Sequence, residues 1–234
     1  MTVTLMLHRR RGFIALLSAV ALLAALGAGA AASEHTVSAA ALGHSHANVA
    51  PAARTVAQAR FHDQMRKLWE DHVTWTRLAI VSFADGSAGF DATAGRLLAN
   101  QTDIGDAIKP FYGAAAGNEL TSLLRDHIGI AVQLLHAAKA ADSAAFASAK
   151  AAWYRNADDI ADFLATANPR SWPQAVMRAA MTEHLDQTLA EAAHELNGQY
   201  AASVTDYDEI HHHILDMADL LSAGIIRAFP QRFH

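Results

Sequence analysis

The feature that most constrains the fold of this chain is a pattern that occurs three times at nearly constant spacing. An acidic residue directly precedes a histidine in three places: Asp71–His72, Asp126–His127 and Glu183–His184. These histidines are followed, 28, 29 and 29 residues later, by Asn100, Asn156 and His213. Internal repetition of this kind indicates one structural unit that is used three times within the chain.

The spacing of apolar residues predicts that each unit is a pair of helices. From Gln58 onward apolar residues recur at helical spacing, and the alternation of apolar and polar residues that is typical of strands is absent. Breaks rich in Gly, Pro, Asn and Asp divide the chain into six expected helices: 57–84, 91–108, 114–140, 143–166, 173–197 and 200–228. We therefore expect an all-α fold, a six-helix bundle of three αα-hairpin repeats.

The constant spacing also predicts where the repeated polar residues meet. In an antiparallel hairpin, two residues equally far from the turn lie at the same height along the bundle. The expected layer comprises His72, Asn100, His127, Asn156, His184 and His213. Three aspartates follow the second member of each pair by three residues, which is about 4.5 Å along a helix. They are Asp103, Asp159 and Asp216.

Histidine and aspartate on facing helices are typical of metal sites in helical bundles. We expect a divalent transition metal, with Zn, Fe, Mn and Cu all suited to these ligands. The candidate metal ligands are His72, His127, His184, His213, Asp103, Asp159 and Asp216. The acids that precede the repeated histidines are expected to orient imidazoles of neighbouring helices. Metal storage, metal transfer and metal-dependent chemistry all fit this set, and no catalytic residue is singled out.

The same residues also suit a hydrogen-bonded polar layer that fixes the register of the helices without any metal. Thr76 and Thr188 lie one turn after their histidines and fit such a layer. The alternative function is then that of a non-catalytic helical interaction module. His211 and His212, which adjoin His213, are expected to be solvated.

Residues 1–32 have the features of an export signal. A basic start at Arg9–Arg11 precedes an apolar run over 13–26, and small residues follow up to Ala32. The segment RRGFI (10–14) resembles a twin-arginine signal, and an ordinary secretory signal is the alternative. Because the apolar run is short for a membrane span, we expect a periplasmic or secreted protein with no stable membrane anchor after signal cleavage.

The remaining features of the sequence limit the classes of partner that we expect. Residues 33–56 lack periodicity and are rich in Ser, Ala, Gly and Pro, which predicts a flexible linker before a bundle domain at 57–234. The chain has no cysteine, so disulfides and thiolate metal sites are excluded. The net charge is −5 and basic residues do not cluster, so no nucleic-acid partner is expected. The expected partner is a metal ion.

Three segments resemble a group of small bacterial proteins that often carry export signals. They are LWEDHVTWTRLAIVSFADG (68–86), LLANQTDIGDAIKPFYG (97–113) and WYRNADDIADFLA (153–165). The likeness spans about 65–230 and implies an exported all-helical protein. Members of this group carry glycosyltransferase and acetylglutamate kinase labels. Both activities usually need a nucleotide-binding α/β framework, and the sequence of this chain shows no strands that could form one. An enzyme that matches these labels is the second alternative.

Overall fold

The computed structural model describes residues 54–234, and its regular secondary structure over that range is entirely helical. The helices are α1 (Val56–Ala84), α2 (Phe90–Lys139), α3 (Ser143–Ala167), α4 (Gln174–Leu196) and α5 (Tyr200–Ala228), followed by a short 3-10 helix, η3 (Pro230–Arg232). The predicted all-α class is therefore confirmed. The predicted export signal (1–32), and the predicted linker up to residue 53, lie outside the described residues.

Local sequence explains where the helices begin and end. Thr55 and Gln58 form a capping box, in which each side chain accepts a hydrogen bond from the backbone N–H of the other, and so fix the start of α1. Asp142 caps α3 by accepting a hydrogen bond from the N–H of Ala145. Between α4 and α5, Gly198 has a φ of 71°, a left-handed conformation that favours glycine.

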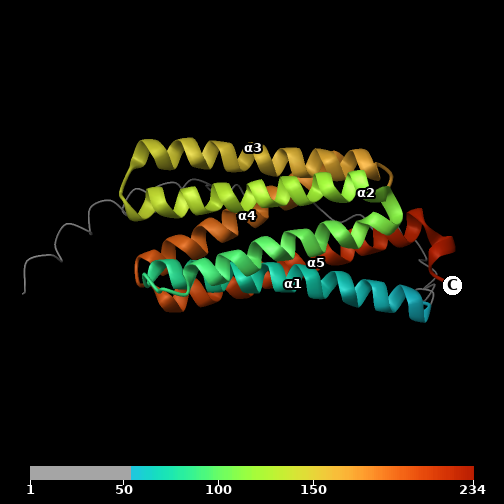
Figure 1. Ribbon diagram of the computed structural model, residues 1–234, viewed down its shortest axis with the longest axis horizontal. Helices are drawn as coiled ribbons and strands as arrows, with labels where there is room; N and C mark the ends of the chain where they lie inside the picture. Colours follow the sequence, from blue (N-terminus) through green and yellow to red (C-terminus); the bar gives the residue numbers. More distant parts are fainter. Residues whose placement is uncertain (1–53) are drawn as a thin grey trace, which may run out of the picture. The chain divides into compact units, whose positions relative to one another are not determined.

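The prediction of six helices is not met, because the expected helices 91–108 and 114–140 form the single helix α2. Helical hydrogen bonding continues past Pro110, but the backbone leaves the helical region at Gly113, with φ 87° and ψ 167°. Glycine adopts this conformation without a steric penalty. The chain therefore changes direction at one residue and needs no separate loop. Figure 1 shows the sharp turn: the first half of α2 runs beside α1 and the second half beside α3.

The two halves of α2 meet at a pair of glycines. A Cβ atom placed on Gly105 would lie 2.5 Å from the carbonyl oxygen of Gly117, and one on Gly117 would lie 2.6 Å from the carbonyl oxygen of Gly105. Both glycines are buried. The bend at Gly113 thus brings backbone against backbone, a contact that side chains at either position would prevent.

The helices pack in a closed order around one core. α1 contacts α2 and α5, α2 contacts α3, α3 contacts α4, and α4 contacts α5, so the first and last helices are neighbours (Figure 1). The most deeply buried apolar residues of the core include Ile104, Ile160, Leu185, Ile214 and Ile225. They come from four of the helices, α2, α3, α4 and α5.

Aromatic rings from both ends of the described chain pack together. Phe61 of α1 contacts Phe111 of α2 and Phe233, with ring centres 5.0 and 5.3 Å apart. Phe229 lies against Phe111 at 5.6 Å, and the hydroxyl of Thr55 donates a hydrogen bond to the carbonyl of Phe233. These contacts hold the start of α1 to the segment after α5.

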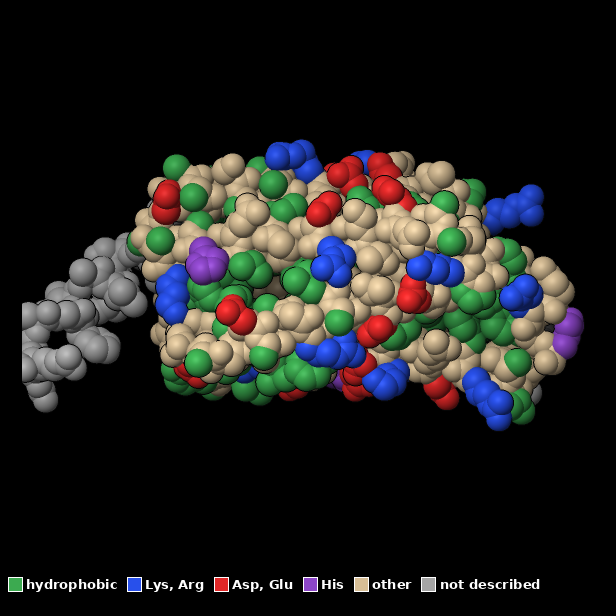
Figure 2. All heavy atoms as spheres, in the orientation of Figure 1, with side chains coloured by type: hydrophobic (Ala, Val, Ile, Leu, Met, Phe, Trp, Pro, Cys, Tyr) green, Lys and Arg blue, Asp and Glu red, His purple; other side chains and the backbone are tan. Residues whose placement is uncertain are grey.

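The surface of the bundle carries mixed charges. On the face shown in Figure 2, Lys and Arg side chains alternate with Asp and Glu rather than gathering into a patch of one sign. Among the helices of residues 54–234, none has an apolar stretch long enough to span a bilayer.

The glycine contact within α2 leads to a direct test. Gly105→Ala should lower the free energy of unfolding by about 1–3 kcal/mol, because the new methyl group overlaps the backbone of Gly117. Gly95→Ala, at a position on the same helix where a Cβ meets no atom within 4 Å, should be neutral or slightly stabilising. Urea denaturation of both variants measures the difference, and equal stabilities would contradict the crossing at Gly105.

Candidate functional site

Four of the repeated polar positions are histidines that come together inside the bundle. His72 lies on α1, His127 on the second half of α2, His184 on α4 and His213 on α5. Only 3%, 3% and 4% of His72, His127 and His184 are exposed, and 12% of the His213 side chain. Each buried histidine adjoins an apolar core residue in sequence, Val73, Ile128 or Leu185. Each buried histidine also follows a buried apolar residue by three positions, Trp69, Leu124 or Met181. Because residues three apart lie on the same face of a helix, the imidazoles point inward.

His184 lies at the centre of this group, which we call the histidine cluster (His72, His127, His184 and His213). The centre of its ring is 5.8 Å from that of His72, 6.3 Å from that of His127 and 6.4 Å from that of His213. The indole rings of Trp69 and Trp153 pack beside His72 and His127, at 5.8 and 5.1 Å. The cluster therefore has aromatic surroundings rather than solvent.

The same hydrogen bond is made three times around the cluster. A side chain on one helix donates to the backbone carbonyl four residues before the histidine of another helix. Asn100 donates to Leu68 at 3.0 Å, Asn156 to Leu123 at 3.1 Å, and His213 to Ala180 at 2.9 Å. The recurrence agrees with the constant spacing of 28 or 29 residues in the sequence.

The hydrogen bonds also indicate which ring nitrogens carry protons. His127 Nδ1 lies 2.8 Å from Asn156 Oδ1, which can only accept, so Nδ1 is protonated and Nε2 holds the lone pair of the neutral ring. His213 Nε2 donates to a carbonyl and leaves its lone pair on Nδ1. The His72 Nδ1 accepts from Gln101 Nε2 at 3.2 Å. His184 differs, because its buried Nδ1 has no hydrogen-bond partner among residues 54–234.

Burial keeps His72, His127 and His184 neutral. It lowers the pKa of His72 to about 3, with a further lowering from the nearby His127 and a partial offset from the Gln101 hydrogen bond. Burial lowers the pKa of His127 to about 4, against the opposing effect of Asn156. The pKa of His184 falls well below its usual value, first through burial and then through repulsion from His72, His127 and His213. Near neutral pH the three rings offer lone pairs rather than positive charges.

The three aspartates of the expected ligand set do not join the histidine cluster. Asp103, Asp159 and Asp216 are exposed on the outer surfaces of α2, α3 and α5. Asp103 pairs there with Arg96 at 3.4 Å. The reason is helical geometry, since the residue four positions after each layer residue, rather than three, points inward. Those inward positions are held by Ile104, Ile160 and Met217.

The acids that precede the repeated histidines behave differently from one another. The Glu183 carboxylate lies 3.7 Å from Nδ1 of His213 on the neighbouring helix, the kind of contact that was expected of these acids. Asp71 instead pairs with Lys67 at 2.5 Å on its own helix. Asp126 is exposed. His211 and His212 stay outside the cluster; His211 pairs with Glu70 at 3.1 Å, and His212 is exposed.

Within the described range 54–234, no three histidine, aspartate or glutamate side chains converge closely enough to hold one metal ion. The imidazoles approach one another in pairs around His184. The arrangement therefore offers lone pairs in an aromatic interior, without the closed cage of three or four ligands that zinc usually requires.

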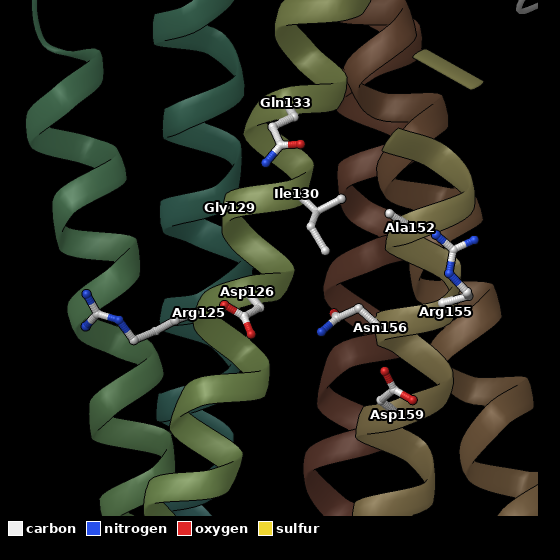
Figure 3. A pocket seen from close by; sticks show the side chains of 9 residues that line it. All are labelled: Arg125, Asp126, Gly129, Ile130, Gln133, Ala152, Arg155, Asn156 and Asp159. Carbon is white, nitrogen blue, oxygen red and sulfur yellow. The ribbon is translucent and has the colours of Figure 1, made fainter. Parts of the chain in front are cut away.

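A groove of about 400 Å³ lies on the surface between α2 and α3. Asn156, which is 6% exposed, lines the groove and also accepts the hydrogen bond of His127. Figure 3 shows Asp126 and Asn156 on facing sides of the groove. Asn156 thus connects the solvent side of α3 with the histidine cluster.

Sequence reasoning missed Gln101. This side chain is fully buried. Its Nε2 donates hydrogen bonds to the carbonyl of Leu97 at 2.7 Å and to Nδ1 of His72. Its burial could have been predicted from the sequence, because Gln101 directly follows Asn100 and precedes the inward-facing Ile104 by three residues. A polar residue of that size at the edge of an apolar stripe usually has a buried partner.

A second buried polar group was also missed. Arg77 of α1 lies between two glutamates of α4, with Nη1 2.9 Å from Glu191 and Nη2 3.4 Å from Glu195. Ser203 of α5 donates a hydrogen bond to Glu195 at 2.6 Å. The glutamates are 1% and 5% exposed. Burial raises the pKa of Glu191 to about 7, despite the opposing effect of Arg77, with repulsion from Asp206 and Glu195 adding to the rise.

Comparisons with protein-family models, with curated proteins and with solved structures find no match to this chain.

The buried histidines predict a loss of stability in acid. Their pKa values in the folded protein lie below the value of about 6.5 in the unfolded chain, so the stabilisation is complete above pH 6.5 and is lost as pH falls toward 4 and 3. Between pH 7.5 and 5.0 each buried histidine should cost about 2 kcal/mol of unfolding free energy. Urea denaturation at the two pH values measures this loss. His127→Gln should reduce it by about 2 kcal/mol, whereas the exposed control His212→Gln should leave it unchanged.

The glutamate pair predicts the opposite dependence. The pKa of Glu191 is raised in the folded protein, so its contribution is most favourable below pH 4.5 and is lost as pH rises to about 7. The contribution of Glu191 to the unfolding free energy should therefore fall by about 1–3 kcal/mol between pH 5 and pH 8. Glu191→Gln should avoid this loss and so gain stability relative to the unmodified protein at the higher pH. Thermal and urea unfolding measure the change. The exposed control Glu209→Gln should show no such gain, and an equal response in both variants would contradict the burial of an excess carboxylate.

Proposed function

We propose that this protein binds a transition-metal ion through imidazoles in the interior of its helical bundle. The observation that carries the proposal is His184, a buried imidazole whose Nδ1 has no partner within residues 54–234 and which three other imidazole rings surround at 5.8–6.4 Å. A buried polar atom without a partner is costly, and a metal ion supplies one.

The protonation states support binding of a cation. A histidine must be neutral to ligate a metal, and burial holds His72, His127 and His184 in that form near neutral pH. Imidazole suits Zn, Cu, Fe and Ni. The proposed ligands are histidines alone, because Asp103, Asp159 and Asp216 lie on the surface.

We propose further that three copies of one helical hairpin build the layer. The bend at Gly113 divides α2 into two arms, and the hydrogen bonds of Asn100, Asn156 and His213 recur at equivalent positions. With the export signal expected at 1–32, the site of action is the periplasm or the cell exterior. The protein would there hold a metal or hand it on.

A second candidate function is favoured by those same three hydrogen bonds. They join neighbouring helices at one level and need no metal, so they suit a polar layer that fixes helix register in an interaction module.

Metal loading separates the two candidates. We expect untagged protein, incubated with Zn²⁺, Co²⁺, Ni²⁺ or reduced copper and then desalted, to retain about one equivalent of at least one metal by elemental analysis. The bound metal should raise the melting temperature, because it binds the folded state alone. His184→Gln should abolish both effects.

The control is His212→Gln, an exposed histidine on the helix that carries His213, and it should retain the metal. Metal-free protein with an unchanged melting temperature for every ion would exclude metal binding. The polar layer would then be tested by Asn100→Ala and Asn156→Ala, each of which should lower the unfolding free energy by about 1–3 kcal/mol.

A further inference from the structure

We infer that the ion held at this site is cuprous copper, bound in two-coordinate fashion between His127 and His184. The inference rests on the proposed function and names the metal and its ligands. Three features of the histidine cluster support it: the number of ligands that converge, the distance between the rings, and the charge of the surroundings.

The number of converging ligands sets the first limit. Zinc is held by three or four protein ligands, and manganese and ferrous iron favour higher coordination with carboxylates among the ligands. Among residues 54–234 no group of three ligands converges, and the carboxylates of the predicted set are outside. Cuprous ion, with a filled d shell, forms stable linear complexes with two nitrogen donors, so a pair of imidazoles is sufficient.

The separation of the rings fits such a pair. With metal–nitrogen bonds of about 2 Å and ring centres about 1 Å behind the nitrogen, two imidazoles on opposite sides of an ion have their centres about 6 Å apart. The centres of His127 and His184 are 6.3 Å apart. The ring planes are stacked at 26° to each other, so binding requires the side chains to rotate until one nitrogen of each ring faces the ion.

The hydrogen bonds select His127 as the partner of His184. Asn156 accepts from His127 Nδ1 and thereby leaves the lone pair on Nε2, as the second-sphere partners of metal-bound histidines do. His72 Nδ1 already accepts from Gln101. The Nδ1 of His213 lies 3.7 Å from the carboxylate of Glu183, which occupies that side of the ring.

The charge of the surroundings favours a monovalent ion. The cost of moving an ion into a low-dielectric interior grows with the square of its charge, so a monocation costs about one quarter as much as a dication. Trp69 and Trp153 pack against the cluster, and its ligands are neutral. No carboxylate of the expected set is inside to offset a second positive charge.

Competition titrations test the inference on the full folded domain. Under anaerobic conditions, a chromophoric chelator of cuprous ion and a separate zinc dye report the affinity of the protein for Cu⁺ and for Zn²⁺. We expect one Cu⁺ per chain, bound at least about 100-fold more tightly than Zn²⁺. X-ray absorption of the copper-loaded protein should show two nitrogen neighbours.

Variants identify the ligands. His127→Gln and His184→Gln should each lose tight Cu⁺ binding, while His72→Gln and His213→Gln should retain it; circular dichroism checks that each variant is folded. Tighter binding of Zn²⁺ than of Cu⁺, three or four nitrogens at the copper, or equal losses in all four variants would overturn the inference while leaving metal binding intact. No binding of either ion would overturn this inference, and the absence of Co²⁺ and Ni²⁺ binding as well would overturn the proposed function.

Discussion

The burial of uncharged imidazoles at the centre of an apolar bundle is the constraint on which the rest of the structure depends. Histidine is tolerated there because its partners come from other helices: Asn156 holds His127, and Gln101 holds His72. Each such bond joins two segments that are 29 residues apart in the chain. These bonds join neighbouring helices at the level where the rings lie together.

The sequence predicted much of this arrangement because the information is local and repeated. Helical spacing, capping residues and the constant separation of His127 and Asn156 indicated helices that fold back with equal arms. The burial of His72 and His184 followed from the same pattern. The repeat also predicted that Asn100, Asn156 and His213 occupy equivalent places, and their hydrogen bonds to Leu68, Leu123 and Ala180 agree with it.

What the sequence did not reveal depended on rotation about the helix axis and on contacts between distant segments. Asp103 and Ile104 are adjacent in sequence, yet the first is exposed and the second buried. The difference of about 100° between them decides which is near the histidines. The sequence did predict a break between residues 108 and 114, where α2 bends at Gly113, but it did not reveal the contact between Gly105 and Gly117 that accompanies the bend.

The histidine cluster and the Arg77–glutamate group respond to pH in opposite directions. Around His184 the structure excludes positive charge, whereas around Glu191 it excludes a second negative charge beside Glu195. Protonation therefore destabilises the first group, where it would compete with the proposed metal, and stabilises the second. Since both groups involve α1 and α4, through His72 and His184 and through Arg77 and Glu191, the packing of these helices is sensitive to acid and to base for separate reasons. A metal ion at the histidines would protect against the first and leave the second unchanged.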